Sequence, residues 1–201
     1  MKSRIIIFGS SCNPLGNHHL NIIRSLVEIF GKVIVYPCGA RPKQKPSTNL
    51  VSRWHKKNLV RLALSGQDGV DIDLHDLDFN EFTPTWLIDQ RYRAFSDIEV
   101  WHVIGGDLIK EGATGNSEIQ TTWEKGKEIW QNLNWIVIDH PNCPIDPADL
   151  PPKSILIKID KLSGRSSDIR ERIQKGLSVT GLVPKEVEKY IVSQDLYRPQ
   201  Q

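Results

Sequence analysis

The sequence of 201 residues is poor in cysteine, and it has only Cys12, Cys38 and Cys143, without a CxxC pair. An odd number of isolated cysteines excludes a disulfide framework and a closed thiolate zinc site as the organising principle. Apolar runs of the roughly 18–20 residues that span a bilayer are absent, and residues 1–8 are too short for a signal-peptide core. Neither sign of charge dominates, since 26 Lys and Arg accompany 24 Asp and Glu. We therefore expect a cytoplasmic protein that has no membrane or nucleic acid partner.

The sequence does contain a regular alternation of short apolar runs and amphipathic stretches. Six runs in which apolar residues do not alternate with polar ones predict buried strands. These runs are 4–8, 32–36, 70–74, 99–104, 135–138 and 154–159. The segments with helical spacing are 18–30, 50–64, 84–94, 122–131, 167–175 and 184–193. Strands that alternate with helices predict an α/β fold, with a Rossmann-like doubly wound parallel sheet covered by helices on both faces. We expect a single domain over residues 1–201.

Ligands of open α/β sheets bind beyond the carboxyl ends of the strands. Four loops lie there: 9–17, 37–49, 105–116 and 162–167. In the first loop, small residues would let the backbone approach an anion, and the helix that follows begins with His18 and His19 behind Asn17, a plausible N-cap. The N-terminus of such a helix suits a phosphate, whose charge would draw the imidazoles toward their charged form. An ordinary tight turn with two surface histidines is the competing interpretation.

Residues 9–20, GSSCNPLGNHHL, resemble the first signature of the nicotinate mononucleotide adenylyltransferases, G-G-S/T-F-N/D-P-x-H-x-G-H. The matching positions are Gly9, Ser11, Asn13, Pro14 and His19. The departures are Ser10, Cys12, Gly16 and His18. Gly16 stands where the family has its first histidine, and His18 occupies the glycine of the motif. The resemblance implies that His19 contacts the phosphates of ATP, and His18 could supply the missing imidazole.

Three further segments extend this resemblance along the chain. VIGGD at residues 103–107 is similar to the family's I-I-G-x-D, whose glycine and aspartate line the nucleotide site. Trp123 stands where these enzymes carry a tryptophan beside the pyridine ring. SSDIR at residues 166–170 resembles I-S-S-T-x-I-R, with Arg165 and Ser167 in place of its first serine and its threonine.

The resemblance implies an enzyme that transfers AMP from ATP to nicotinate mononucleotide, or to the nicotinamide form, and releases pyrophosphate. The catalytic residues it implies are His18, His19 and Arg170. The ATP and phosphate contacts it implies are Gly9, Ser10, Ser11, Lys45, Gly105, Asp107, Ser166 and Ser167. The pyridine-nucleotide contacts it implies are Asn13, Thr83, Thr85 and Trp123. We expect Mg²⁺ to arrive with ATP without a side-chain ligand of its own, the partners to be small molecules, and the chain to be capable of forming a homo-oligomer.

Adenylyl transfer needs no strong general base, because the attacking phosphate is already ionised. Catalysis must come from alignment and from neutralisation of charge in the transition state. Two alternatives remain open at this point. One is a sister nucleotidyltransferase with another phosphorylated acceptor. The other is a nucleotide-binding or sensing protein that has lost turnover, which Gly16 favours, since losing one charge-stabilising donor costs about 10²–10³ in rate.

Several other residues have purely structural interpretations. Asp168 and Glu171 fit a capping box at the start of a helix, and Arg170 could pair with an acidic side chain at the surface. His102, in the middle of a strand, is expected to be an interior histidine. Trp135 is expected in the core. The basic residues of the loop 37–49 could contact phosphate or remain solvated.

Overall fold

The computed structural model describes residues 3–40, 51–94, 98–139, 144–159 and 164–198. Six strands form one sheet in the order β3-β2-β1-β4-β5-β6, and every neighbouring pair is parallel. The strands are β1 (Ser3–Ser10), β2 (Val33–Pro37), β3 (Val70–Ile72), β4 (Ile98–Gly105), β5 (Asn134–Asp139) and β6 (Ser154–Lys158). The prediction of a doubly wound parallel sheet is confirmed.

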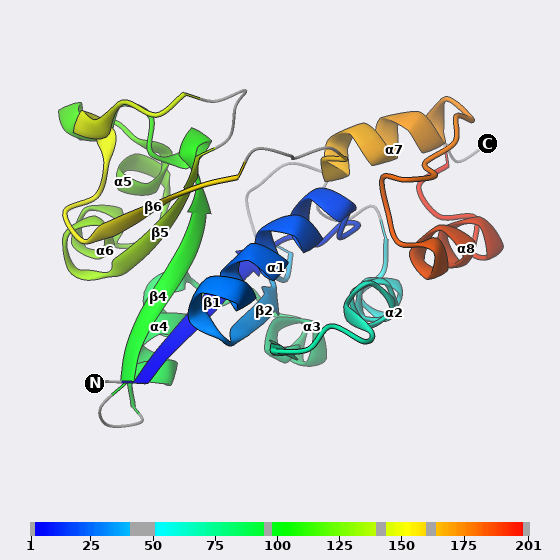
Figure 1. The fold of residues 1–201 in the computed structure, drawn as a ribbon, viewed down its shortest axis with the longest axis horizontal. Coiled ribbons are helices and arrows are strands. Elements are labelled where there is room, and N and C mark those ends of the chain that lie inside the picture. The colour runs from blue at the N-terminus through cyan, green and yellow to red at the C-terminus, as the bar shows by residue number, and fades with distance from the viewer. Residues whose placement is uncertain (1–2, 41–50, 95–97, 140–143, 160–163, 199–201) are drawn as a thin grey trace.

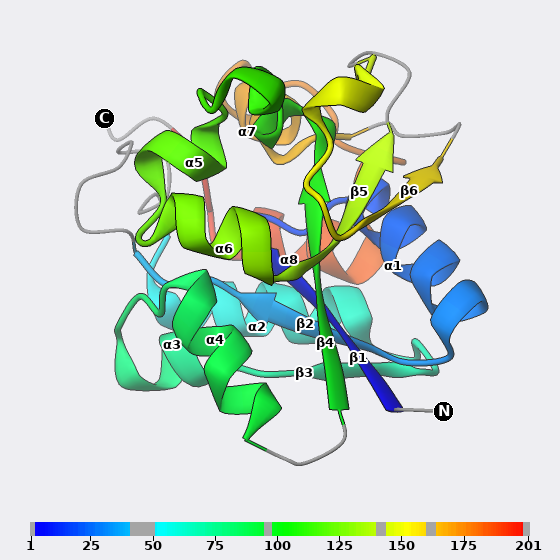
Figure 2. The same cartoon turned by 90° about the vertical axis from the view of Figure 1, so that its left-hand side faces the viewer.

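Helices cover both faces of this sheet (Figures 1 and 2). They are α1 (Asn17–Phe30), α2 (Arg53–Leu64), α3 (His75–Phe79), α4 (Thr85–Arg93), α5 (Glu118–Thr122), α6 (Gly126–Asn132), α7 (Ser166–Gln174) and α8 (Lys185–Ser193). Apolar residues of α1, α2, α7 and α8 pack in one core cluster, whereas those of α4, α5 and α6 pack in two clusters with the opposite strand residues. Figure 2 shows α7 at the end of the sheet to which the arrows of β4 and β5 point.

The first helix illustrates how the apolar spacing becomes a packed face. Leu20, Ile23 and Leu26 recur every three residues and are each at most 2% exposed. Burial of such a side chain contributes about 1.5–3 kcal/mol. The helix ends at Gly31, whose φ of +82° is readily adopted only by glycine.

The prediction of one helix over residues 122–131 is wrong, because the chain forms two short helices there. α5 ends at Thr122, and α6 begins only at Gly126 after Lys125 takes a left-handed φ of +56°. Gly126 packs so closely on the carbonyl of Ile119 that a Cβ would overlap it. A capping box of Ser117 and Gln120 starts α5, and this S-x-x-Q spacing was a sequence signal for the earlier start.

Three smaller expectations are also wrong. α1 is capped by Gly16, while the Asn17 amide donates to the Gly181 carbonyl over 2.8 Å. α7 has Arg165 at its N-cap without a side-chain cap, so Asp168 lies in its first turn and forms no capping box. β3 stops at Ile72, and the short helix α3, which was not predicted, follows it.

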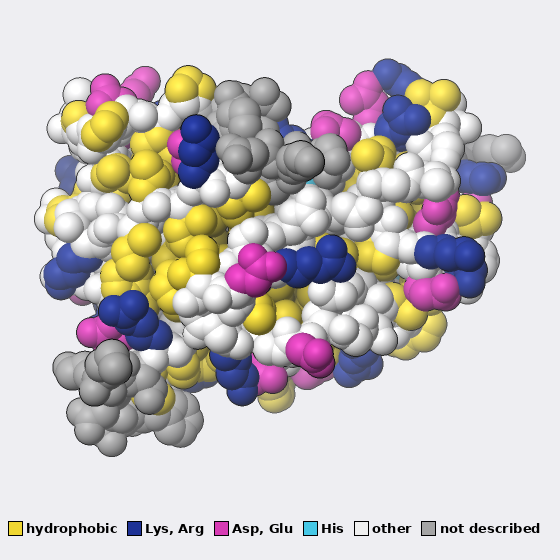
Figure 3. All heavy atoms as spheres, viewed as in Figure 1, with side chains coloured by type: hydrophobic (Ala, Val, Ile, Leu, Met, Phe, Trp, Pro, Cys, Tyr) yellow, Lys and Arg dark blue, Asp and Glu magenta, His cyan; other side chains and the backbone are white. Residues whose placement is uncertain are grey.

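The molecular surface carries no large field of one sign on the face shown in Figure 3, where cationic and anionic side chains are interspersed. Hydrophobic side chains gather there between β6 and α1, and Leu156 and Ile29 are 45% and 56% exposed. Within the described residues, the structure has no helix of the length and apolar character that crossing a membrane requires.

Candidate active site

A cavity of about 600 Å³ opens at the carboxyl ends of β1 and β4. These two strands are neighbours at the centre of the sheet, where the strand order reverses and α/β proteins bind their ligands. We call this space the main cavity. Its walls come from the end of β1, the first turns of α1, the turn after β4, Trp123, and the start of α7.

Eleven of the residues expected at the site line the main cavity. They are Gly9, Ser10, Ser11, His18, His19, Gly105, Asp107, Trp123, Ser166, Ser167 and Arg170. Lys45 lies outside the described residues, as do the other basic residues expected in its loop. The N-terminal turns of α1 and α7 therefore meet at one cavity, and both can present backbone N–H groups and partial positive charge to an anion.

His19 is a neutral hydrogen-bond donor in this arrangement. Its Nδ1 accepts the backbone N–H of Gly16 over 3.2 Å, so the ring proton resides on Nε2. Burial, with a smaller contribution from His18, lowers the pKa of His19 to about 3. The protein itself thus holds this imidazole uncharged, whereas the sequence suggested imidazoles drawn toward the charged form by a phosphate.

The packing around Gly16 explains why the first motif histidine is missing. A Cβ at this position would lie 2.5 Å from the Gly164 carbonyl oxygen and 2.7 Å from Cδ1 of Ile169. The segment that leads into α7 therefore occupies the space that a side chain at position 16 would need. The second imidazole at the cavity comes from His18, whose ring centroid lies 4.0 Å from that of His19.

Three hydrogen bonds, which we call the loop clamp, tie the C-terminal part of the chain to the loop between β1 and α1. Arg170 Nη1 donates to the Asn13 carbonyl (2.7 Å), Ser166 Oγ donates to the Pro14 carbonyl (2.8 Å), and Tyr197 Oη donates to Asn13 Oδ1 (2.7 Å). Among the described contacts, Arg170 thus makes this bond and not the surface ion pair that was its alternative interpretation. Asn13 is 1% exposed and lines neither of the cavities at this edge, so its position does not suit the expected pyridine contact.

A smaller space of about 50 Å³, the side cavity, adjoins the main cavity. The two share the wall formed by Gly9, Val103, Ile104 and Trp123. Thr83 and Thr85, both expected at the pyridine ring, line the side cavity together with Phe82, Cys38, Ile7, Ile88, His102 and Trp135. Residues expected to contact phosphate and residues expected to contact pyridine thus line two adjoining cavities.

Asp76, which the sequence reasoning missed, holds one wall of the side cavity. It is 1% exposed and accepts hydrogen bonds from Thr83 Oγ1 (2.6 Å), Tyr36 Oη (2.6 Å) and the Gly39 backbone N–H (2.9 Å). Burial, together with this carboxylate, raises the pKa of Tyr36 above its usual range. Close by, the 3%-exposed Lys56 donates to the Cys38 carbonyl over 3.2 Å, and burial lowers its pKa.

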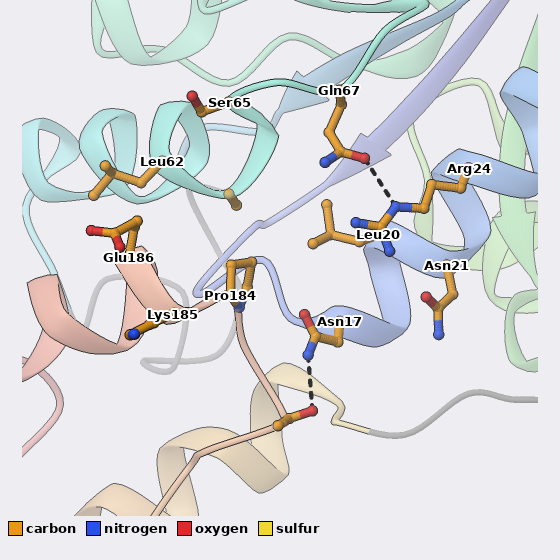
Figure 4. Close-up of a pocket in the computed structure, with 12 residues that line it drawn as sticks. Asn17, Leu20, Asn21, Arg24, Leu62, Ser65, Gln67, Pro184, Lys185 and Glu186 are labelled. Carbon is orange, nitrogen blue, oxygen red and sulfur yellow. Dashed lines mark hydrogen bonds between the residues drawn. The ribbon is translucent and has the colours of Figure 1, made fainter.

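The far side of α1 borders a separate cavity of about 600 Å³ between α1, α2 and the start of α8 (Figure 4). Arg24, Lys185 and Glu186 line it, and Arg24 Nε donates to Gln67 Oε1 over 2.9 Å. The expected site residues within the described ranges all lie away from its lining. Among the described residues, no group of three or more His, Cys, Asp or Glu side chains is arranged to hold a metal ion.

Comparison with known proteins gives a consistent set of relatives. A family model described as Cytidylyltransferase-like matches residues 7–172. A "Probable nicotinate-nucleotide adenylyltransferase" of Shigella boydii is 27% identical over 98% of this chain and 100% of the relative, and one of Thermus thermophilus is 24% identical over 97% and 100%. The solved structure of a Plasmodium falciparum nicotinic acid mononucleotide adenylyltransferase complexed with NaAD superposes with a TM-score of 0.78 at 22% identity, covering 97% of both chains. This structural likeness shows the nucleotidyltransferase fold.

Proposed function

The chain belongs to the cytidylyltransferase-like family, and from that premise we propose that it is a nicotinate-nucleotide adenylyltransferase. One observation carries the proposal: the first turns of α1 and α7 meet the small-residue turn after β1 at a single cavity, and Trp123 lines both this cavity and the adjoining side cavity. The relatives named as nicotinate-nucleotide adenylyltransferases align with nearly the whole chain, which supports nicotinate mononucleotide as the acceptor.

In this proposal the triphosphate of ATP lies in the main cavity. The backbone of residues 9–11 and the N-terminal turns of α1 and α7 supply N–H donors, while His18 and His19 supply imidazole donors. A phosphate oxygen of the mononucleotide attacks the α-phosphorus, and the bond from this phosphorus to the pyrophosphate oxygen breaks. The attacking oxygen is already ionised, so the reaction needs no general base.

Because His19 is neutral, positive charge must come from other groups. Arg170 lines the cavity, so its guanidinium can face a bound phosphate, and its Nη1 donates to the Asn13 carbonyl in the loop after β1. Mg²⁺ bound to ATP would neutralise further phosphate charge. The oxygen donors of Asp107, Ser10 and Ser11 line the cavity and suit the water shell of such an ion.

The pyridine ring lies, in the same proposal, between Trp123 and the side cavity. A tryptophan offers a large flat face for stacking on an aromatic ring, and Trp123 borders both spaces. Thr83 and Thr85 also line the side cavity, and the Thr83 hydroxyl is oriented by its hydrogen bond to Asp76. Asn13 supports the loop after β1 through the loop clamp and is not part of the proposed pyridine site.

A pyrophosphate-release assay tests this function. Purified protein with ATP, Mg²⁺ and nicotinate or nicotinamide mononucleotide should release pyrophosphate well above the rate without acceptor. His18→Ala and His19→Ala should each lower kcat by about 10²–10³-fold. His55→Ala is the matched control, because this histidine on α2 contacts Tyr190 and lines neither cavity.

The two alternatives make different predictions in the same experiment. Binding of ATP without pyrophosphate release from either mononucleotide would identify a nucleotide sensor. Release only with a different phosphorylated acceptor would identify a sister transferase. Full activity of His18→Ala would refute the role given to this second imidazole.

A further inference from the structure

The floor of the side cavity carries two polar aromatic side chains that none of the roles above uses. His102 on β4 and Trp135 on β5 are direct partners in the strand register, so their side chains lie side by side on one face of the sheet. Their ring centroids are 5.8 Å apart, and the residues are 4% and 0% exposed. Both line the side cavity.

Trp135 offers a hydrogen-bond donor that lacks an acceptor in the described part of the chain. Its indole Nε1 is fully buried and has no hydrogen-bond partner among those residues. An indole N–H can only donate, and buried donors in native proteins are nearly always satisfied. The Trp135 ring stands edge-on to Trp123 with centroids 6.4 Å apart. The indole that carries the unsatisfied donor thus lies next to the tryptophan assigned to the pyridine ring.

His102 is held in a fixed orientation from outside the cavity. Its Nε2 lies 3.1 Å from Asp89 Oδ1, and Asp89 also accepts Arg93 Nε over 2.5 Å. Asp89 is 5% exposed and does not line the side cavity. An ionised carboxylate only accepts hydrogen bonds, so Nε2 carries a proton and Nδ1 is the ring's remaining polar atom for a ligand in the cavity.

We propose that Trp135 and His102 bind the 3-substituent of the pyridine ring and that His102 distinguishes a carboxylate from a carboxamide, a proposal that rests on the function proposed above. The Trp135 N–H donates to an oxygen of either group. Neutral His102 accepts a hydrogen bond from the carboxamide NH₂ at Nδ1. A carboxylate needs a donor there, so its binding is accompanied by uptake of one proton to form the imidazolium.

The charges around His102 suit such a proton-linked choice. Asp89 and Arg93 of α4 form an ion pair that is neutral overall, so the imidazolium would bring one net positive charge to meet the carboxylate. The other titratable group lining the cavity within the described residues is the Cys38 thiol. The neighbouring strand positions, Ile7 on β1 and Trp135 on β5, add no titratable group.

The test is the ratio of kcat/KM for nicotinate mononucleotide to that for nicotinamide mononucleotide, measured from about pH 5.5 to about pH 8.5. The ratio cancels the titration of the shared phosphate and of ATP. It should fall with rising pH, approaching about tenfold per unit for one linked proton. A ratio that is constant with pH overturns the proposal.

Variants locate the effect. His102→Gln retains an amide that can donate to Asp89 but removes the ring Nδ1 that would take up the proton. The ratio should therefore become independent of pH. Trp135→Phe should raise KM for both mononucleotides about tenfold while KM for ATP stays within twofold; a merely structural role would move both or neither. His55→Gln is the matched control and should retain the wild-type pH profile.

The outcomes separate the two proposals. Turnover with a constant ratio in the wild-type protein refutes the role of His102 and leaves the adenylyltransferase function standing. Neither turnover nor binding of either mononucleotide refutes both. If His102→Gln does not fold, the wild-type pH profile alone decides between them.

Discussion

Adding a side chain at Gly16 should lower both stability and activity, although the family signature has a histidine there. The backbone at Gly16, with φ −92° and ψ 172°, suits any residue, so replacing glycine by alanine would by itself stabilise the protein by about 0.4–1 kcal/mol. The new Cβ, however, would meet the Gly164 carbonyl oxygen at 2.5 Å and the Leu182 carbonyl oxygen at 3.1 Å. These are backbone atoms that cannot rotate away. We expect the steric effect to prevail.

Overpacking of this kind costs about 1–3 kcal/mol, which for a chain of this length corresponds to a fall in Tm of about 2–12 °C. The strain also separates α7 from α1, so Gly16→Ala should lower kcat by at least about tenfold through the displacement of Ser166 and Arg170. Gly16→His combined with His18→Gly, which restores the order of the family signature, should be worse in both respects.

Urea denaturation and pyrophosphate release measure the two effects. Gly9→Ala is the matched control for stability, because, among the described residues other than its chain neighbours, only Cys38 Sγ lies within 4 Å of the new Cβ, at 4.0 Å. A Gly16→Ala protein as stable as the wild type would refute the steric argument. A fully active double variant would refute the conclusion that position 18 has replaced position 16.

Three further predictions concern buried polar groups. The pKa of His19 is about 3 in the folded state and about 6.5 when unfolded, so between these values the unfolded chain binds more protons than the folded one. The free energy of unfolding should therefore fall by about 2 kcal/mol from pH 7 to pH 5. In urea titrations His19→Gln should lose this part of the pH dependence, and an unchanged pH dependence would contradict the argument. Tyr197→Phe should destabilise the protein by about 1–2 kcal/mol by removing one buried hydrogen bond of the loop clamp, as chemical denaturation would measure, and no change would contradict this. Asp76→Asn should lower the free energy of unfolding by at least about 2 kcal/mol and raise KM for the pyridine mononucleotide, because Thr83 loses the hydrogen bond that orients it. Asp71→Asn, which affects an exposed ion pair with Lys32, should lower the free energy of unfolding by under about 1 kcal/mol in the same thermal and kinetic assays.

The sequence predicted the strands well because a parallel strand buried on both faces is a short uninterrupted apolar run, as residues 4–8 and 135–138 are. It also predicted the residues around the main cavity, since these lie in local segments at strand ends. The same reasoning misplaced the helix around Trp123, because the close approach of Gly126 to the Ile119 carbonyl depends on how the turn folds back.

Asp76 and Lys56 could not have been found in this way. Asp76 stands in the segment DLHDLDF, where acidic residues on either side suggest a solvated face. Its partners Tyr36 and Gly39 are 40 and 37 residues away, and only the assembled sheet brings them together. Similarly, the sequence raised the question of Gly16 but could not answer it, because the answer is contact with Gly164, far along the chain.

The loop clamp also has a consequence for the order in which the protein becomes competent. Its hydrogen bonds join residues 152 to 184 positions apart, and contacts across so long a separation form late, after local ones. During synthesis, the central strands can therefore pair before the loop clamp fixes the loop between β1 and α1. The complete set of three bonds therefore requires a chain that extends to Tyr197.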